Sequence, residues 1–220
     1  MAVAGERPQA GVADPKGRAF LRAADPVLAR LIDARPDFRP RAWMDSLPPL
    51  DAFGTLIFQV AGQQLSVAST RAIISHLQEQ FGGHLPSPAE LLAADPQVLR
   101  AAGFSARKGQ TLRELAQRFV DGRLNDEALA AMTDEEVEAA LTQVPGIGPW
   151  TARGFLLIAL ERPDVFLSGD LALRRAIERA YGLDHLPTDD EVAEISDRWR
   201  PFRSLAVYYL FASEYDGQPG

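Results

Sequence analysis

The spacing of apolar residues along the chain predicts a series of amphipathic helices. In the segment 51–64, apolar side chains recur every three or four residues, which places them on one face of a helix. The segments 67–81 and 106–121 show the same spacing, and 18–34 is also typical of a helix. No segment alternates apolar and polar residues as a half-buried strand does. We therefore predict an all-α protein.

Polar residues at the expected helix starts support this prediction. Ser105 is placed to cap the helix that follows it, and Gly122 to end that helix. Two segments fit the T-x-x-E capping box, Thr133 with Glu136 and Thr188 with Glu191. Much of the acid in these regions is therefore explained by helix starts, where the macrodipole favours negative charge.

The charge of the chain is unevenly distributed. The net charge is −7, but the segments 126–138 and 184–197 each carry six acidic residues and no basic one. Outside these two segments, 23 basic residues face 18 acidic ones, and the segment 100–123 holds six basic residues against two acidic ones. This distribution is compatible with one basic face that binds a polyanion. Ordinary solvated helix surfaces remain the alternative.

Composition excludes several classes of site. Cysteine is absent, which excludes disulfides, zinc–thiolate sites and cysteine-held iron–sulfur clusters. The three histidines, at positions 76, 84 and 185, lie far apart without metal-site spacing. No apolar run is long enough to span a membrane, and residues 1–18 are typical of a flexible polar lead-in. Arginine outnumbers lysine 21 to 2, which favours a GC-rich bacterial source, and we expect a cytoplasmic protein.

A glycine-rich turn within the segment 133–160 is the strongest local signal. A first helix is expected to end near Val144, a second to start at Pro149 or Trp150, and Pro-Gly-Ile-Gly at 145–148 to connect them. The amides of Gly146, Gly148 and the second helix's first turn would point outward at its positive end, which suits a phosphate. The turn is neither a Walker A loop nor a G-x-G-x-x-G motif, because Thr151 replaces the third glycine. A plain turn between two helices is the alternative.

The wider pattern is more specific than the glycines alone. The spacing L-x-x-V-P-G-I-G-x-x-T-A at 141–152 resembles the helix-hairpin-helix of DNA glycosylases, and VFLSGD at 165–170 is similar to their loop with a catalytic Asp. The best resemblance is to the alkylpurine family, DNA-3-methyladenine glycosylase II. VAGQQLSV at 60–67 resembles that family's Gln-containing loop, and RWRPFRS at 198–204 its W-x-P-W-R-S segment. The resemblance covers roughly three quarters of the chain, from Asp51 to Glu214.

This resemblance implies a role for several side chains. Asp170 matches the catalytic Asp, which would stabilise the sugar cation, although it could simply cap a helix. Trp150 stands where strand-cleaving relatives carry a Lys nucleophile, so no amine is present to form a Schiff base. Its indole could stack on a cationic alkylated purine, or it could be a core residue. Phe211 falls where the family has a second pocket aromatic.

The same resemblance implies contacts with DNA. Gln63 and Gln64 would enter the duplex at the lesion, with Gln64 filling the gap left by the flipped base, or they could be an exposed helix-end pair. Relatives often carry an apolar residue at the Gln64 position. Gly146, Gly148 and Thr151 would bind phosphate. No cofactor is expected to be required, but Na⁺ or K⁺ could bind the carbonyls of the three hairpin residues Thr142, Val144 and Ile147.

Together these features predict a two-lobed helical protein with a cleft between the lobes. Helices in 1–47 would pack with a C-terminal lobe, 164–220, that carries the catalytic Asp, and 48–163 would form a central lobe with the hairpin. The N-terminal β-rich domain of larger relatives is not visible. We expect a monomer that acts on double-stranded DNA, not on membranes, and excises alkylated purines such as 3-methyladenine and 7-methylguanine without cleaving the strand. A non-catalytic helix-hairpin-helix DNA-binding module is the alternative, but it would need no acid beyond the hairpin.

Overall fold

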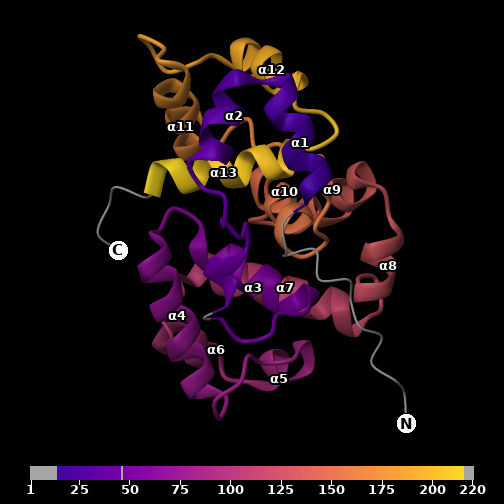
Figure 1. Ribbon diagram of the computed structural model, residues 1–220. Coiled ribbons are helices and arrows are strands. Elements are labelled where there is room, and N and C mark those ends of the chain that lie inside the picture. The colour runs from indigo at the N-terminus through magenta and orange to yellow at the C-terminus, as the bar shows by residue number, and fades with distance from the viewer. Residues whose placement is uncertain (1–13, 46, 216–220) are drawn as a thin grey trace. The chain divides into compact units, whose positions relative to one another are not determined.

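The computed structural model describes residues 14–45 and 47–215, and within these ranges all regular elements are helices (Figure 1). The prediction of an all-α protein is thus confirmed. The helices are α1 (Pro15–Ala24), α2 (Pro26–Asp33), the 3₁₀ helix η1 (Ala42–Met44), α3 (Ala52–Gly62), α4 (Val67–Gln80), α5 (Pro88–Ala93), α6 (Pro96–Ala101), α7 (Ala106–Val120), α8 (Asp126–Ala131), α9 (Asp134–Thr142), α10 (Pro149–Ile158), α11 (Leu171–Tyr181), α12 (Asp189–Asp197) and α13 (Arg203–Tyr215).

The described residues form two compact units. Unit 1 contains 14–45 and 163–215, and unit 2 contains 47–162. The chain therefore leaves unit 1 after η1, builds all of unit 2, and returns. Most of the predicted polar lead-in lies outside the described residues, but its last four residues, 15–18, already belong to α1. None of the described helices is both long and apolar enough to cross a membrane.

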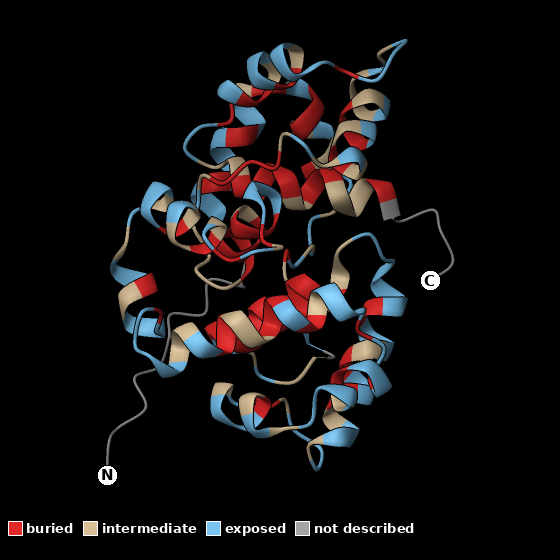
Figure 2. Cartoon of the chain, turned by 180° about the vertical axis from the view of Figure 1, so that it is seen from behind, coloured by how far each residue is buried: buried red, intermediate tan, exposed pale blue. Residues whose placement is uncertain are grey.

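Helix α3 forms the centre of unit 2. It packs against α4, α7 and α10, and every residue from Ala52 to Ala61 is buried. Figure 2 shows in red the buried residues of the described chain. The predicted single apolar face for 51–64 is therefore wrong, because neighbouring helices cover α3 on all sides. As a result the polar residues Thr55 and Gln59 are buried as well.

Unit 1 is built around α13, which contacts α1, α2 and α11. The predicted helix over 18–34 is broken between α1 and α2, because Pro26 cannot donate a backbone hydrogen bond and Asp25 caps α2. Asp25 is fully buried, and its carboxylate accepts hydrogen bonds from the Trp199 indole (3.0 Å) and the Tyr181 hydroxyl. Burial raises the pKa of Asp25, but these bonds and two backbone amides outweigh it, so the net pKa is lowered. This network fixes the start of α2 inside unit 1.

The predicted helix starts are confirmed. The Ser105 hydroxyl accepts a hydrogen bond from the Lys108 amide at 3.3 Å, and the capping boxes of α9 and α12 are both complete. A third capping box, at the start of α5, was not predicted. The caps satisfy amides that a helix leaves outside its own hydrogen-bond ladder.

Candidate functional site

The hairpin between α9 and α10 has the tight geometry that its glycines predict. Gly146 has a φ of +95°, in the region that favours glycine. A Cβ atom at Gly146 would lie 2.2 Å from the hydroxyl of Thr111, which donates a hydrogen bond of 2.8 Å to the carbonyl of Pro145. At Gly148, by contrast, no described residue other than its chain neighbours has an atom within 4 Å of a Cβ position. Gly146 is thus required by the fold, whereas Gly148 leaves open space.

Helix α10 starts without a side-chain cap. Its N-cap is Gly148, whereas each of the other α-helices from α1 to α12 in the described chain is capped by an Asp, Asn, Ser or Thr side chain. The first-turn amides of any helix lie outside its i→i−4 ladder, and the macrodipole makes that end positive. The start of α10 is therefore suited to bind an anion such as a phosphate.

Gln63 connects the end of α3 to this hairpin. Its side-chain amide donates to the carbonyl of Gly146 (3.0 Å) and to the hydroxyl of Thr151 (3.1 Å). Thr151 is only 3% exposed and its hydroxyl is bonded to Gln63, so the predicted phosphate contact would fall to its backbone amide and stays a prediction. Insertion of the Gln63 side chain into DNA would break both of its hydrogen bonds. In this structure Gln63 supports the hairpin.

Gln64 has a different environment. It is exposed, and its φ of +60° is uncommon for a residue other than glycine. The exposed apolar residues Leu65 and Val67 follow it. The Lys108 ammonium holds this loop by donating to the carbonyls of Ala61 (2.8 Å) and Gln63 (2.9 Å), and burial lowers its pKa. Of the two predicted DNA-inserting glutamines, Gln64 is the one whose side chain faces outward.

The hairpin carbonyls predicted to hold a monovalent cation are those of Thr142, Val144 and Ile147. The Val144 carbonyl already accepts a hydrogen bond from the Ile147 amide at 3.0 Å, but a carbonyl oxygen has a second lone pair. Among the described residues, no cluster of three or more acidic or histidine side chains could bind a metal. A backbone site for Na⁺ or K⁺ remains a prediction.

Trp150 is the second residue of α10. It is 37% exposed, whereas Trp199 in unit 1 is 0% exposed. The alternative that Trp150 is a core residue does not fit this exposure. The indole instead presents apolar surface next to the uncapped start of α10, where a flat ligand could stack on it.

Asp170 is the N-cap of α11, and its carboxylate accepts a hydrogen bond of 2.8 Å from the Leu173 amide. The side chain is half-buried, and the residue after it, Leu171, is exposed. The loop before it, 163–170, is fixed by buried apolar residues at 165–167 and by a hydrogen bond from the Asp170 amide to the Leu167 carbonyl (2.9 Å). Capping and chemistry are compatible here, because capping holds the carboxylate in one position.

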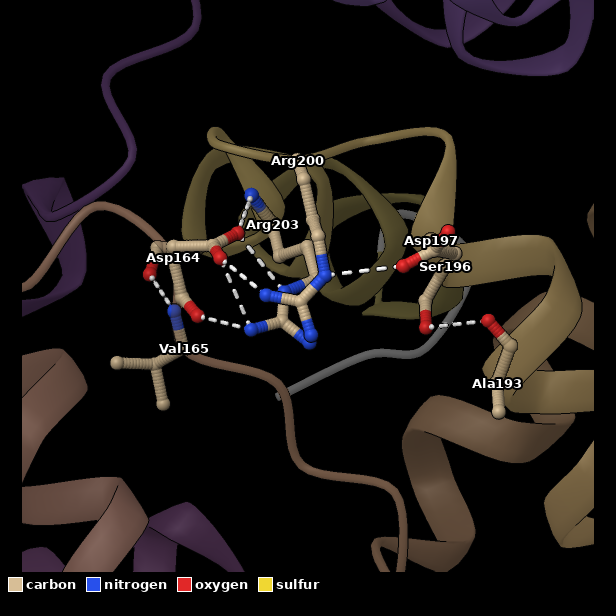
Figure 3. Close-up of polar contacts among 8 residues, drawn as sticks. Asp164, Val165, Ala193, Ser196, Asp197, Arg200 and Arg203 are labelled. Carbon is tan, nitrogen blue, oxygen red and sulfur yellow. Dashed lines mark hydrogen bonds and ion pairs between the residues drawn. The ribbon is translucent and has the colours of Figure 1, made fainter. Parts of the chain in front are cut away.

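The segment 198–204 anchors the start of this loop (Figure 3). The Arg203 guanidinium donates to the Asp164 carboxylate at 2.8 and 3.0 Å and to the Asp164 carbonyl at 2.7 Å. Arg200 donates to the same carboxylate at 2.7 Å, and the Val165 amide donates to the Ser204 hydroxyl at 2.9 Å. The sequence had marked this segment by resemblance only. Its contacts show that it holds the loop that carries Asp170.

Phe211 lies on α13 and is half-buried. It belongs to unit 1 together with Asp170, whereas Trp150, Gln64 and the hairpin belong to unit 2. The predicted pocket role of Phe211 is compatible with this exposure and stays a prediction.

Three of the basic residues in 100–123 bind helix ends rather than forming an open basic face. Besides Lys108, Arg113 donates to carbonyls at the end of α5 (3.1–3.3 Å), and Arg118 donates to the Gln143 carbonyl at the end of α9 (3.2 Å). Helix C-termini attract cations because the macrodipole is negative there. Sequence reasoning missed this role, since charge alone does not reveal the partner.

Residues 57–201 match the HhH-GPD superfamily of base excision DNA repair proteins. This range contains the hairpin, Trp150 and Asp170. The chain belongs to this superfamily.

Similar proteins cover most of the chain. DNA-3-methyladenine glycosylase 1 of Schizosaccharomyces pombe is 32% identical over 198 residues, which are 89% of this chain and 86% of that protein. DNA-3-methyladenine glycosylase 2 of Escherichia coli is 31% identical over 86% of this chain, but over only 64% of its own length. The structure of the S. pombe enzyme in complex with abasic DNA matches with a TM-score of 0.83 and 31% identity, over 93% of this chain and 100% of that one.

Proposed function

We propose that this HhH-GPD protein is a DNA-3-methyladenine glycosylase of base excision repair, which hydrolyses the N-glycosidic bond of alkylated purines in duplex DNA. The observation that carries this proposal is the 32% identity to the S. pombe glycosylase, which extends over 89% of this chain and 86% of that enzyme. We expect it to act as a monomer, because a single chain supplies both the hairpin and Asp170.

The first step is extraction of the damaged nucleotide from the duplex. Unstacking a base costs a few kcal/mol, and less at a damaged pair. The first-turn amides of α10 and those of Gly146 and Gly148 would bind the DNA backbone as a phosphate site. Gln64, which is exposed at the end of α3, would fill the gap left by the flipped base. Carbonyls of Thr142, Val144 and Ile147 would hold the monovalent cation, which would add positive charge near the same phosphate.

Trp150 would then receive the flipped base. Alkylation at N3 or N7 makes a purine cationic, and a cation over an indole gains about 1–2 kcal/mol when both are desolvated. The positive charge also makes the base a good leaving group, so no general acid is needed. The exposed indole at the start of α10 supports this role. Phe211 would be a second aromatic contact.

Asp170 would stabilise the positive charge that develops on the sugar as the bond breaks, and would orient the attacking water. The bond from the Leu173 amide and the anchored loop 163–170 support this role, because they fix the carboxylate before the reaction starts. A fixed charge needs no reorganisation in the transition state, which is the source of its effect on rate.

The reaction would end at an abasic site without cleavage of the strand. Strand cleavage by a glycosylase needs an amine that forms a Schiff base, and the corresponding position is Trp150. The chain has two lysines, and the one in unit 2, Lys108, donates to two backbone carbonyls.

The test uses end-labelled duplexes, each carrying one alkylated or control base. We expect release of the alkylated base, with strands that stay intact until heat or alkali is applied. No covalent complex should form with borohydride. Nicked strands or a trapped complex would show a lyase. Duplex binding without release of any alkylated base would favour the non-catalytic DNA-binding module.

A further inference from the structure

Two glutamines of α3 face α10, and only one of them has an evident structural role. The helices run antiparallel along this contact, since Gln63 meets Thr151 and Gln59, one turn earlier, meets Gly154. A Cβ atom on Gly154 would lie 2.8 Å from the Nε2 atom of Gln59 and 2.9 Å from its Oε1 atom. The Gln59 amide therefore fills the space that a side chain at position 154 would take.

The Gln59 side chain fills space beside Gly154, but its polar amide has no structural explanation. It is 6% exposed, yet in the part of the chain that the structure describes its amide makes no hydrogen bond, unlike that of Gln63. A buried amide without a partner is unfavourable, and an apolar residue would fill the same space at lower cost. The Gln59 amide is not among the side-chain groups of the described residues that lack a partner and are fully enclosed. Its nitrogen and oxygen atoms are therefore still accessible from outside. These facts point to a ligand as its partner.

The position of the amide over Gly154 puts it on the face of α10 that also carries Trp150. A Cβ atom on a helix tilts toward the helix N-terminus, and residues i−4 and i−3 lie on the same face. The space over Gly154 thus lies toward Trp150 and Thr151. Thr151 is buried and bonded to Gln63, whereas the Trp150 indole is 37% exposed. A ring that stacks on this indole would therefore lie on the same face of α10 as the Gln59 amide, within reach of a hydrogen bond to its edge.

We propose that Gln59 is a specificity-determining residue, which hydrogen-bonds to the edge of the purine stacked on Trp150 and favours adenine lesions over guanine lesions. This inference rests on the proposed function. A glutamine amide can bond in a bidentate manner to N6 and N7 of adenine, donating to N7 and accepting from N6. Both positions are available in 3-methyladenine. In 7-methylguanine N7 carries the methyl group, and O6 is an acceptor in place of the amino donor.

The experiment measures both bases in one reaction. DNA treated with dimethyl sulfate contains 3-methyladenine and 7-methylguanine, and chromatography of the released bases gives the initial rate for each under enzyme excess. The substitution Gln59→Met keeps the size of the side chain and removes the amide. We expect 3-methyladenine release to fall by about tenfold to a hundredfold, the range of one bidentate base contact. Release of 7-methylguanine should change by less than about threefold, because it lacks the bidentate contact.

The ratio of the two rates separates base recognition from damage to the fold, since a smaller folded fraction lowers both rates alike. Gly154→Ala provides a second variant, because its methyl group would push the Gln59 amide aside while alanine is a good helix former. It should lower the ratio in the same direction. Thr55→Val is the matched control: it removes a buried polar group one turn earlier on α3, farther from Trp150, and should leave the ratio unchanged.

An unchanged ratio in Gln59→Met would overturn the inference, as would an equal loss of both rates in Gln59→Met and Gly154→Ala. If the unmodified protein releases neither base, the proposed function itself fails. That result is distinguishable, because it appears before any substitution is made.

Discussion

The helices α10 and α11 begin in opposite ways. Both follow a loop that contains glycine, and both start next to a residue to which we assign a role in the reaction. At α11 the Asp170 carboxylate occupies the positive helix end through its bond to the Leu173 amide. At α10 the N-cap is Gly148, which has no side chain to do so.

This difference shows how one physical property can serve two purposes. The positive end of a helix attracts negative charge whether the charge belongs to the protein or to a ligand. At α11 the protein supplies the charge and thereby fixes a carboxylate. At α10 the protein leaves the position open, and a phosphate can take it.

The largest expected effect is that of Asp170→Asn. Asn and Asp are nearly equal as N-caps, so the free energy of unfolding should change by no more than about 1 kcal/mol. The negative charge that faces the sugar cation is lost, and such terms contribute about 3–4 kcal/mol to the rate. Single-turnover excision should therefore fall at least about a hundredfold, while binding to an abasic-site duplex persists. A folded Asp170→Asn protein with nearly unchanged excision would leave Asp170 as a helix cap only.

A second comparison uses the two glycines of the hairpin. Gly146→Ala introduces a side chain at a φ of +95° and against the Thr111 hydroxyl, so it should destabilise the protein by about 2 kcal/mol. Gly148→Ala adds its methyl group to open space, so only the poorer N-cap preference of Ala acts against it, and stability should fall by about 0.5–1 kcal/mol. Chemical denaturation of both variants measures the difference. Equal losses would mean that the backbone at Gly146 is not what restricts this turn.

The third substitution gives α10 an aspartate N-cap like the one at α11. Gly148→Asp supplies a capping carboxylate, which should keep or slightly raise stability. It should lower the affinity for damaged and undamaged duplexes alike, by about tenfold, because the carboxylate competes with phosphate for the same amides. Gly148→Asn caps without adding charge and should have a smaller effect in the same binding titration. If Gly148→Asp binds DNA as well as the unmodified protein, α10 does not bind phosphate through its start.

The sequence predicts the helices well because their signals are local. The capping boxes at Thr133 and Thr188 and the Pro-Gly-Ile-Gly turn act within a few residues, so the pattern alone determines them. The burial of α3 on all sides could not be predicted in this way, because besides the neighbouring α4 it depends on α7 and α10, which lie far along the chain.

Candidate site residues could be predicted only where a single residue stands within a recognisable sequence motif. The roles of Asp170 and Trp150 were inferred from resemblance and stay predictions, but the local sequence places both residues correctly, at the starts of α11 and α10. The contacts of Gln63 with Gly146 and Thr151 are different, since they join residues more than 80 positions apart. No local pattern marks such pairs, so the support that Gln63 gives the hairpin could not be predicted, and its insertion into DNA stays a prediction from the resemblance.

The basic side chains that bind helix C-termini have a consequence for the salt dependence of DNA binding. When a protein binds DNA, each phosphate neutralised by a lysine or arginine releases counterions, and the logarithm of the binding constant falls by about 0.9 per such contact for each unit of log salt. Lys108, Arg113 and Arg118 already donate to carbonyl groups within unit 2, so they are not placed to release counterions from a duplex. Backbone amides at the helix start, which carry only partial charge, would make many of the contacts with DNA phosphates instead. The affinity of this protein for DNA should thus decline with salt less steeply than its 23 basic residues suggest.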